Sequence, residues 1–313
     1  MKKIIFMGTP TFAVPILESL IESGYDIVKV VTQPDRPKGR KRILTPSPVK
    51  EVAIKHHIPV FQPEKLRESY EELLESDIDL IVTAAYGQLL PNELLEHPKF
   101  GSINVHASLL PELRGGAPIH HAIIQGKKET GITIMYMADK LDSGDIISQR
   151  EVPIEMSDDV GILHDKLSEL GSTLLIETLP TIFNRTNKRI PQDETKATFA
   201  YNVTREDEKI AWSQSHIEVY NQIRGLHPWP GAYTKHNGHV LKVWSAQLGV
   251  KKYEDCAPGT IVAIEDEQFI VVVCGNEQTV KMSSIQVAGK KRMSVKDYLL
   301  GNPNAWQVGE TLE

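Results

Sequence analysis

The chain has 313 residues, 41% of them hydrophobic and 24% charged, and a formal net charge of -6 at pH 7. This length favours two domains, and the composition is that of an ordinary globular protein without the roughly 18 consecutive apolar residues that a membrane-spanning helix requires. The net charge argues against a nucleic-acid partner, although a phosphate backbone responds to local clusters of Lys and Arg rather than to the total.

The first half of the chain alternates short apolar runs with segments of helical spacing. The apolar runs predict strands, and the helical spacings predict helices between them. Because strands alternate with helices and several of the strands are almost entirely apolar, we expect a mostly parallel α/β sheet covered on both faces, with a ligand crevice at the carboxyl ends of its strands. The predicted strands span residues 3–7, 27–31, 80–84 and 102–105, and the predicted helices span residues 14–21, 48–56 and 64–75.

The next segment predicts a change from parallel to antiparallel pairing. Residues 132–136 and 145–148 are apolar runs joined by a turn, which is typical of an antiparallel pair. A long helix is expected from about 159 to 183, with Ser157 or Asp158 as its N-cap.

The last third of the chain has short β-like runs separated by turn residues. One more helix is expected at 210–226, and the runs that follow it predict a small β-barrel. We therefore divide the chain into a first domain at residues 1–189, a polar linker at 190–205 and a C-terminal β-barrel domain at 206–313. The predicted strands of the barrel include residues 239–244, 259–263 and 269–273.

The densest set of polar residues lies at the end of the strand predicted at 102–105. Asn104 and His106 are two residues apart, so a strand places both side chains on the same side, where the ligand crevice is expected. Gly115 and Gly116 in the following loop permit a tight backbone path. Each side chain also has an ordinary explanation, since Asn104 could cap the strand and His106 could be a hydrogen-bonded core histidine.

Asp142 lies in a Leu-Asp-Ser-Gly-Asp sequence whose composition is typical of a turn. A role as turn former therefore explains Asp142 as well as a catalytic role does. Taken together, however, a strand-end Asn, a strand-end His and a loop Asp suit acyl transfer to an amine. Histidine exchanges protons near neutral pH, a carboxylate orients it, and an amide N–H stabilises an oxyanion by typically about 3 kcal/mol.

Other reaction classes lack their motifs in this sequence. There is no G-x-S-x-G, no H-E-x-x-H and no paired Cys/His spacing, which argues against a serine hydrolase and against a metal site. The first βα turn, residues 8–13, lacks the later glycines of a dinucleotide fingerprint. Cys256 and Cys274 are far apart, and we expect both to be reduced, buried side chains in a cytoplasmic protein.

These motifs resemble those of the folate-dependent formyltransferases. The resemblance is carried by Asn104-Val-His106 with the following Ser-Leu-Leu-Pro111 and Arg114-Gly, and by Asp142-x-Gly-Asp. Because the whole family shares the Asn, His and Asp, they indicate the reaction class only. The resemblance extends from end to end to the branch that formylates a charged tRNA, through residues 8–10, 32–37, 46–50, 85–87 and 227–232.

The resemblance implies a Rossmann-like formyltransferase domain followed by a small, OB-like β-barrel that binds tRNA. It implies that the formyl group of 10-formyltetrahydrofolate, a reduced folate, passes to the α-amino group of a charged initiator methionyl-tRNA. Asn104, His106 and Asp142 would be the catalytic residues, and no metal, membrane or DNA would take part. The folate would contact Ser108, Leu109, Leu110 and Pro111, together with Leu89, Leu90 and Pro91.

Two basic clusters agree with a tRNA partner. The first lies in an aperiodic loop with Pro and Gly within residues 33–50, the second lies near the C-terminus, and basic loops contact phosphates. A solvated run of charges is the alternative explanation of either cluster. The clusters consist of Arg36, Lys38, Arg40, Lys41 and Arg42, and of Lys290, Lys291 and Arg292.

Two other functions remain open from the sequence. A formyltransferase that acts on an amino-sugar nucleotide would share the Asn104, His106 and Asp142 set, but it would not need the basic loop. A non-catalytic tRNA-binding protein on the same scaffold would need the basic clusters, but it would not need the Asn, His and Asp.

Overall fold

The computed structural model describes residues 1–39, 41–75 and 77–313, and for Lys38 the backbone only. The chain forms two compact units, each assembled from three segments. The first unit contains Met1–Pro118, Glu129–Pro153 and His164–Tyr201, and the second contains Ile119–Lys128, Ile154–Leu163 and Asn202–Glu313.

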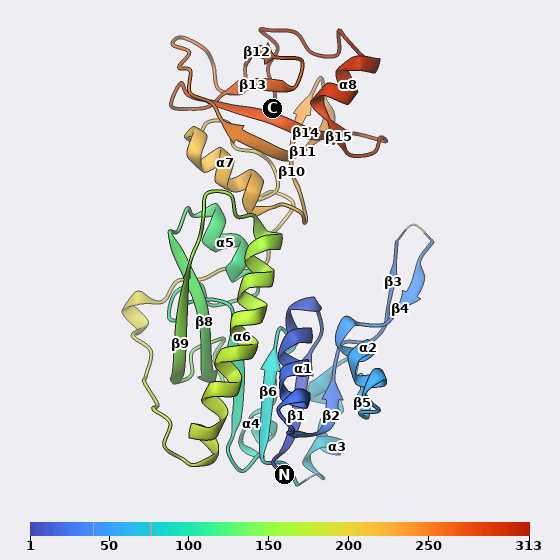
Figure 1. Ribbon diagram of the computed structural model, residues 1–313, viewed down its shortest axis with the longest axis vertical. Coiled ribbons are helices and arrows are strands. Elements are labelled where there is room, and N and C mark those ends of the chain that lie inside the picture. The colour runs from blue at the N-terminus through green and yellow to red at the C-terminus, as the bar shows by residue number, and fades with distance from the viewer. Residues whose placement is uncertain (40, 76) are drawn as a thin grey trace. The chain divides into compact units, whose positions relative to one another are not determined.

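A seven-stranded sheet organises the first unit (Figure 1), in the order β5-β2-β1-β6-β7-β8-β9. The strands from β5 to β7 are parallel, and β8 is antiparallel to both of its neighbours. The mostly parallel sheet predicted from the sequence is therefore confirmed. The strands are β1 (Lys3–Gly8), β2 (Asp26–Val31), β5 (Val60–Phe61), β6 (Leu80–Ala84), β7 (Ser102–His106), β8 (Glu129–Tyr136) and β9 (Ile146–Pro153).

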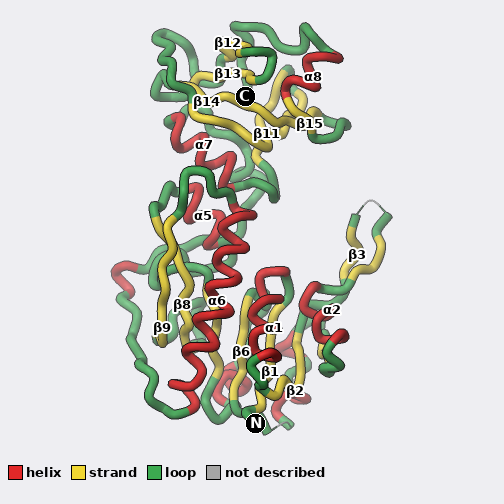
Figure 2. Tube along the Cα trace, viewed as in Figure 1, coloured by secondary structure: helices red, strands yellow, loops and turns green. Residues whose placement is uncertain are grey.

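Helices cover both faces of this sheet, as Figure 2 shows for α1 and α6 on one face. On the opposite face, Ile5 and Ile81 share a buried cluster with Leu73 of α3 and Leu94 of α4. The alternation of side chains along a strand places Asn104 on this second face and Val105 on the first. The helices are α1 (Val14–Glu22), α2 (Pro48–Lys55), α3 (Glu71–Leu74), α4 (Asn92–Glu96) and α6 (Val160–Phe183), with short 3-10 turns at Thr11–Ala13, Leu66–Glu68 and Glu194–Lys196.

Helix α6 lies close to the sheet because Gly171 has no side chain. A Cβ placed at Gly171 would be 3.1 Å from Val105 of β7, 3.5 Å from Ile16 of α1 and 3.6 Å from Ile132 of β8. The Ser168 hydroxyl, one turn earlier, donates a hydrogen bond of 2.7 Å to the carbonyl of Phe12. This helix therefore fixes the strand that carries Asn104 and His106 from the side opposite to those two residues.

The predictions for the helix at 64–75 and for the N-cap of α6 were wrong. The helix expected at 64–75 is broken, because Ser69 has an extended φ of -153° and separates the 3-10 turn from α3. The N-cap of α6 is Asp159, whose Oδ1 accepts a hydrogen bond of 2.9 Å from the Ile162 amide. Asp158, one of the two residues predicted to cap α6, instead accepts a bond from the Glu155 amide.

The second unit is rich in strands, as predicted. Its antiparallel sheet has the order β10-β11-β14-β13-β12, and β15 pairs with β14. The strands are β10 (Ala232–His236), β11 (His239–Leu248), β12 (Ile261–Glu265), β13 (Phe269–Val273), β14 (Thr279–Val287) and β15 (Met293–Ser294), and the helices are α5 (Pro118–Ile124), α7 (His216–Gly225) and α8 (Val295–Gly301). No helix in the described part of the chain is both long and apolar enough to span a bilayer.

Residues 309–313 connect the two outer strands of the second sheet. The amides of Gly309 and Leu312 donate bonds of 2.8 Å to the carbonyls of Ile261 and Gly259, beside β12. The Glu313 amide donates a bond of 2.9 Å to the carbonyl of Lys235 in β10, and the Lys235 amide donates one back. The segment therefore pairs with both outer strands and closes the sheet into a barrel.

Helix α7 begins six residues later than the 210–226 prediction. The Ile210 amide donates to the carbonyl of Tyr233, so the chain here runs beside β10 rather than as a helix. Ser215 then forms a capping box, because its hydroxyl accepts from the Glu218 amide and the Glu218 carboxylate accepts from the Ser215 amide. The Ser-x-x-Glu pattern of such a box was present in the sequence and marks the true start of the helix.

We predict that Ser215→Ala lowers the free energy of unfolding of the second unit by about 1 kcal/mol, because the first turn of α7 loses its cap. All four tryptophans lie within residues 202–313, so tryptophan fluorescence during urea unfolding reports on this unit. Ser172→Ala in the middle of α6 is the control, and it should leave this transition unchanged. An unshifted urea midpoint in Ser215→Ala would contradict the prediction.

Candidate active site

Asn104 is oriented by a hydrogen bond from the neighbouring strand. In the parallel pairing of β6 and β7, Thr83 lies beside Asn104, and the Thr83 hydroxyl donates to Asn104 Oδ1 at 2.8 Å. Thr83 is 3% exposed, so this bond forms inside the protein. This bond identifies Oδ1 as the acceptor of the Asn104 side chain, whose amide N–H groups are its donors.

His106 is buried at the end of the same strand, and its two ring nitrogens have different environments. Nε2 lies 3.0 Å from the carbonyl oxygen of Leu113. A carbonyl only accepts hydrogen bonds, so Nε2 carries the proton and Nδ1 of the neutral ring carries a lone pair. Nδ1 lies 3.7 Å from Oδ2 of Asp142, which is too long for a direct hydrogen bond.

Asp142 reaches this site from the turn between β8 and β9. Its backbone adopts a left-handed conformation with φ of 48°, which is uncommon outside glycine but tolerated by Asp. Oδ2 accepts a hydrogen bond of 2.8 Å from the Gly115 amide, and a Cβ at Gly115 would lie 2.7 Å from the carbonyl oxygen of Ala200. Asp142 therefore forms the turn and also lies beside His106, so the two explanations given from the sequence do not exclude each other.

The residues expected to bind folate divide into buried and exposed ones. Ser108 is fully buried, and its hydroxyl donates to the carbonyl of Glu112 at 2.6 Å, so it shapes the loop rather than facing a ligand. Leu110 is also buried, and its carbonyl accepts from Gln149 at 2.8 Å. Leu90 is buried, Leu89 is 58% exposed, and the remaining expected contacts, Leu109, Pro111 and Pro91, are half-buried.

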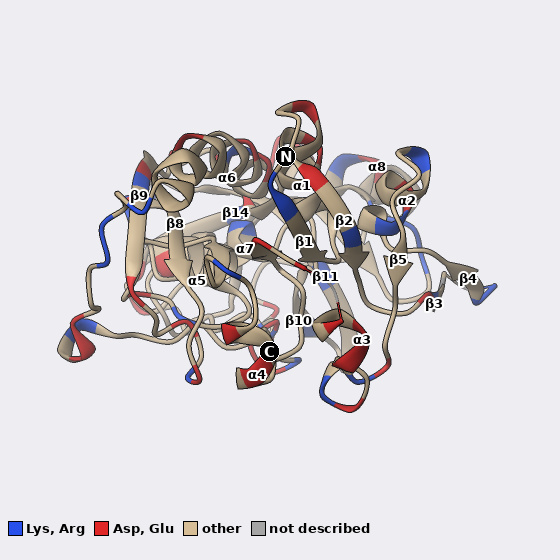
Figure 3. Ribbon diagram, turned by 90° about the horizontal axis from the view of Figure 1, so that it is seen from below, with Lys and Arg blue, Asp and Glu red and all other residues tan. Residues whose placement is uncertain are grey.

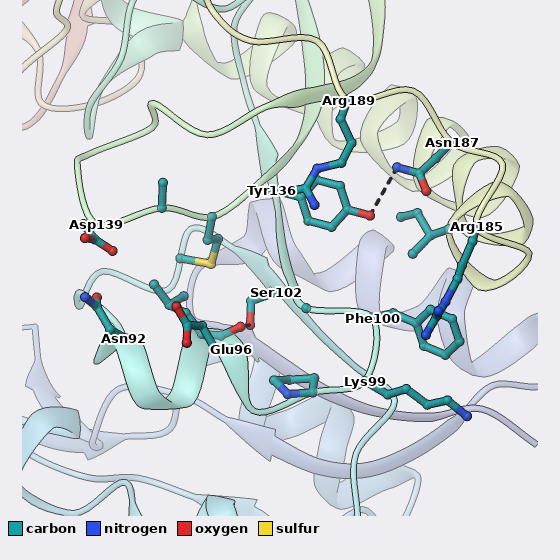
Figure 4. Close-up of a pocket in the computed structure, with 16 residues that line it drawn as sticks. Asn92, Glu96, Lys99, Phe100, Ser102, Tyr136, Asp139, Arg185, Asn187 and Arg189 are labelled. Atoms are coloured by element: carbon teal, nitrogen blue, oxygen red, sulfur yellow. Dashed lines mark hydrogen bonds between the residues drawn. The ribbon is translucent and has the colours of Figure 1, made fainter.

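An open hollow of about 610 Å³ lies in the first unit, at the amino end of β7 (Figure 4). Its wall includes Gly101 and Ser102 at the start of β7, Met137 just after β8, and Arg189. His106 lies at the other end of β7, and none of the residues expected to bind folate is part of the wall.

Sequence reasoning missed the buried network behind Asp142. The Arg114 guanidinium is 3% exposed and forms two hydrogen bonds to the Gln192 side-chain oxygen and two to the Glu194 carboxylate. The bond from Arg114 also lowers the pKa of the Glu194 carboxyl. Gln192 and Glu194 lie in the segment expected to be a linker, whose polar composition gave no sign that it packs against the site.

The basic loop expected within residues 33–50 contains a β-hairpin formed by β3 (Arg36–Lys38) and β4 (Ile43–Thr45). Arg36 pairs with Glu64 at 2.7 Å, whereas Lys41 and Arg42 are exposed in the turn that precedes β4. Figure 3 shows Lys and Arg in blue on the β3–β4 hairpin. The sequence of this segment shows no periodic spacing of apolar residues, so the two short strands were not predicted. Arg40 and the side chain of Lys38 lie outside the described residues.

The second basic cluster occupies the turn between β14 and β15. Lys290, Lys291 and Arg292 are all exposed. The Lys290 ammonium lies 5.1 Å from the ring centre of Tyr298, and the Arg292 guanidinium lies 5.2 Å from that of Trp244. Cations beside aromatic rings form a surface suited to stacked bases and phosphates.

Family models match most of the chain. The model described as formyl transferase matches residues 1–179, and the model described as formyl transferase, C-terminal domain, matches residues 202–303. The chain belongs to the formyl transferase family. The resemblance and the fold class predicted from the sequence are thereby confirmed.

Relatives of this formyltransferase match over nearly their whole length. It is 57% identical over 312 residues to the methionyl-tRNA formyltransferase of Lysinibacillus sphaericus, covering 99% of both chains. It is 58% identical over 303 residues to that of Bacillus subtilis, covering 96% of this chain and 95% of the relative.

Solved structures agree with the fold of this formyltransferase. The N-formyltransferase from Helicobacter canadensis in complex with folinic acid and dTDP-3-aminofucose superposes with a TM-score of 0.70 at 21% identity, covering 90% of this chain and 99% of that one. The methionyl-tRNA formyltransferase from Clostridium thermocellum superposes with a TM-score of 0.55 at 18% identity, covering 79% and 93%. At such identities these structures support the fold alone.

We predict that Thr83→Val lowers kcat/KM of this formyltransferase roughly tenfold, because Asn104 loses the bond that orients its amide. Thr83→Ser keeps the hydroxyl and serves as the matched control. Steady-state kinetics of formyl transfer, combined with thermal unfolding, separates the effect from instability. Equal kcat/KM values in the two variants would show that Asn104 does not need this bond.

Proposed function

We propose that this formyltransferase moves the formyl group of 10-formyltetrahydrofolate to the α-amino group of initiator methionyl-tRNA. The observation that carries the proposal is the 57% identity to a methionyl-tRNA formyltransferase over 99% of both chains. This match includes both domains and the basic hairpin. A formyltransferase that acts on a different acceptor would not need to resemble the methionyl-tRNA enzymes in the hairpin or in the second domain.

The chemistry follows from the arrangement around His106. The deprotonated methionyl nitrogen attacks the formyl carbon, and the amide of Asn104 donates a hydrogen bond to the oxygen as it becomes an oxyanion. The attacking nitrogen passes its proton to Nδ1 of His106. The bond between the formyl carbon and N10 of the folate then breaks, and N10 leaves with a proton. Asp142, 3.7 Å from Nδ1, stabilises the imidazolium formed in between.

The folate would lie across the loops that surround Asn104. Leu89 and Leu90 on one side and Leu109 to Pro111 on the other would contact the donor. No group of three or more His, Cys, Asp or Glu side chains in the described residues is arranged to hold a metal ion, and our mechanism uses none.

The tRNA would be bound by both basic clusters. Lys41 and Arg42 on the hairpin, with Arg36, Lys38 and Arg40, would contact phosphates of the tRNA, and so would Lys290 to Arg292. We assign catalysis to residues 1–189, tRNA binding to residues 206–313 and the connection to residues 190–205. Translation initiation takes place in the cytoplasm, and we place the enzyme there.

We predict that His106→Ala and Asp142→Asn each lower kcat for formyl transfer by about 10²- to 10⁴-fold, because proton transfer from the amine loses its acceptor or its electrostatic support. Circular dichroism and the affinity for the folate donor should stay close to the wild-type values. Near-normal kcat in both variants would exclude the mechanism. If wild-type enzyme formylated an amino-sugar nucleotide but not methionyl-tRNA, the acceptor assignment itself would fail.

We also predict that Lys41→Ala/Arg42→Ala raises KM for methionyl-tRNA at least several-fold and leaves KM for the folate unchanged. If both residues contact phosphates, a plot of the logarithm of the tRNA binding constant against the logarithm of the salt concentration should become less steep. The slope should change by roughly 0.7–0.9 for each contact that is lost. Lys2→Ala/Lys3→Ala removes the same charge at the amino end of β1 and is the matched control. An equal response in both double variants would point to total charge rather than to a hairpin contact.

A further inference from the structure

We propose that Gln192 is a positioning residue for the formyl transfer, acting by holding the Asp142 turn and the Arg114–Gly115 segment in fixed relation. The inference rests on the role proposed above for Asp142. It adds a residue that does not touch the reacting atoms and that lies in a segment without regular secondary structure.

The side-chain amide of Gln192 uses all of its hydrogen-bonding capacity. Its oxygen accepts from Arg114 Nε at 3.1 Å and from Arg114 Nη2 at 2.8 Å. Its nitrogen donates to the carbonyls of Asp142 and Gly144, both at 2.8 Å. Two acceptor positions and two donor positions are therefore filled, and reversing the amide would turn all four contacts repulsive.

The two groups that Gln192 joins meet again at the carboxylate of Asp142. Gly115, the neighbour of Arg114, donates its amide to Asp142 Oδ2 at 2.8 Å, and this same oxygen lies 3.7 Å from His106 Nδ1. Gln192 thus holds the Asp142 main chain directly, through the Asp142 carbonyl. It also holds Arg114, which precedes Gly115, and the Gly115 amide holds the Asp142 carboxylate. Both constraints determine where the carboxylate lies relative to the imidazole.

The Asp142 turn needs such support because its conformation is not one that the chain adopts readily. Asp142 has φ of 48°, and its carbonyl is one of the two that accept from Gln192. A turn freed from this contact would have access to right-handed conformations that withdraw the carboxylate from His106. In contrast, the hydrogen bonds described for Glu194 go to Arg114 and not to the turn.

Gln192→Glu separates a positioning role from a merely structural one. The carboxylate of Glu would still accept both bonds from Arg114, with added charge attraction, so the buried guanidinium would keep its partners. The second carboxylate oxygen, however, would face the carbonyl oxygens of Asp142 and Gly144 with no hydrogen between them. A structural role therefore predicts an active, stable variant, and a positioning role predicts a stable variant with low kcat.

The experiment compares Gln192→Glu with Glu194→Gln in the full-length enzyme, using methionyl-tRNA and 10-formyltetrahydrofolate. We expect kcat of Gln192→Glu to fall by roughly 10²-fold, the typical cost of a misplaced catalytic group. Both KM values should stay within about twofold, and thermal stability should be retained. Glu194→Gln removes the charged partner of Arg114 but not the turn contact, so its kcat should stay within about twofold of wild type.

A double-mutant cycle with Asp142→Asn completes the test. If Gln192 acts through Asp142, adding Gln192→Glu to Asp142→Asn should reduce kcat by less than about threefold. Wild-type-like kcat in Gln192→Glu, or full additivity in the double variant, would overturn the inference. Failure of the wild-type enzyme to formylate methionyl-tRNA would instead refute the proposed function, so the two failures are distinguishable.

Discussion

The hydrogen bond from the Gly115 amide to the Asp142 carboxylate joins two loops on which the site depends. One loop leaves β7 after His106, and the other connects β8 with β9. At 2.8 Å this bond ties the acidic group of the second loop to the main chain of the first. A backbone donor has no rotamers to lose, and a charged acceptor makes the bond stronger than a neutral one would be. The 3.7 Å approach of Asp142 to His106 follows from this connection.

The sheet supplies the other half of the site. Parallel pairing of β6 with β7 sets Thr83 beside Asn104, and the alternation along β7 sends Asn104 and His106 to the same face. On the opposite face, Gly171 lets α6 press against Val105. The strand carrying the two polar side chains is therefore held from behind by apolar contacts and oriented in front by a buried hydroxyl.

Features with a local signal were predictable from the sequence. The apolar runs of β1, β2, β6 and β7 stand out because buried parallel strands have few polar residues. The spacing of Asn104 and His106 indicated that they share a face. Residues whose role depends on distant partners had no such signal. Nothing near Gln192 or Glu194 in the sequence indicates that Arg114, about 80 positions away, would be buried against them.

The starts of two helices were mispredicted because a polar side chain fixes the first turn of each. Asp159 and Ser215 accept hydrogen bonds from amides in the first turn of a helix, and both residues begin their helices later than hydrophobic spacing alone suggested. Hydrophobic periodicity shows that a helix exists, whereas its first residue is decided by a single polar group. The hairpin of β3 and β4 was not predicted because strands of three residues are too short to show an alternation of polar and apolar residues.

The pairing of residues 309–313 with both β10 and β12 also bears on how this protein behaves at high concentration. An antiparallel sheet with two free outer strands offers unsatisfied amides and carbonyls to other chains, which is a common route to edge-to-edge association. Here one short segment occupies both outer strands at once. Residues 208–210 also exchange main-chain bonds with Tyr233, so the outer edge of β10 is covered by two separate segments of the chain. The outer strands of this sheet therefore have main-chain partners within the same molecule, which leaves fewer groups for pairing with another copy.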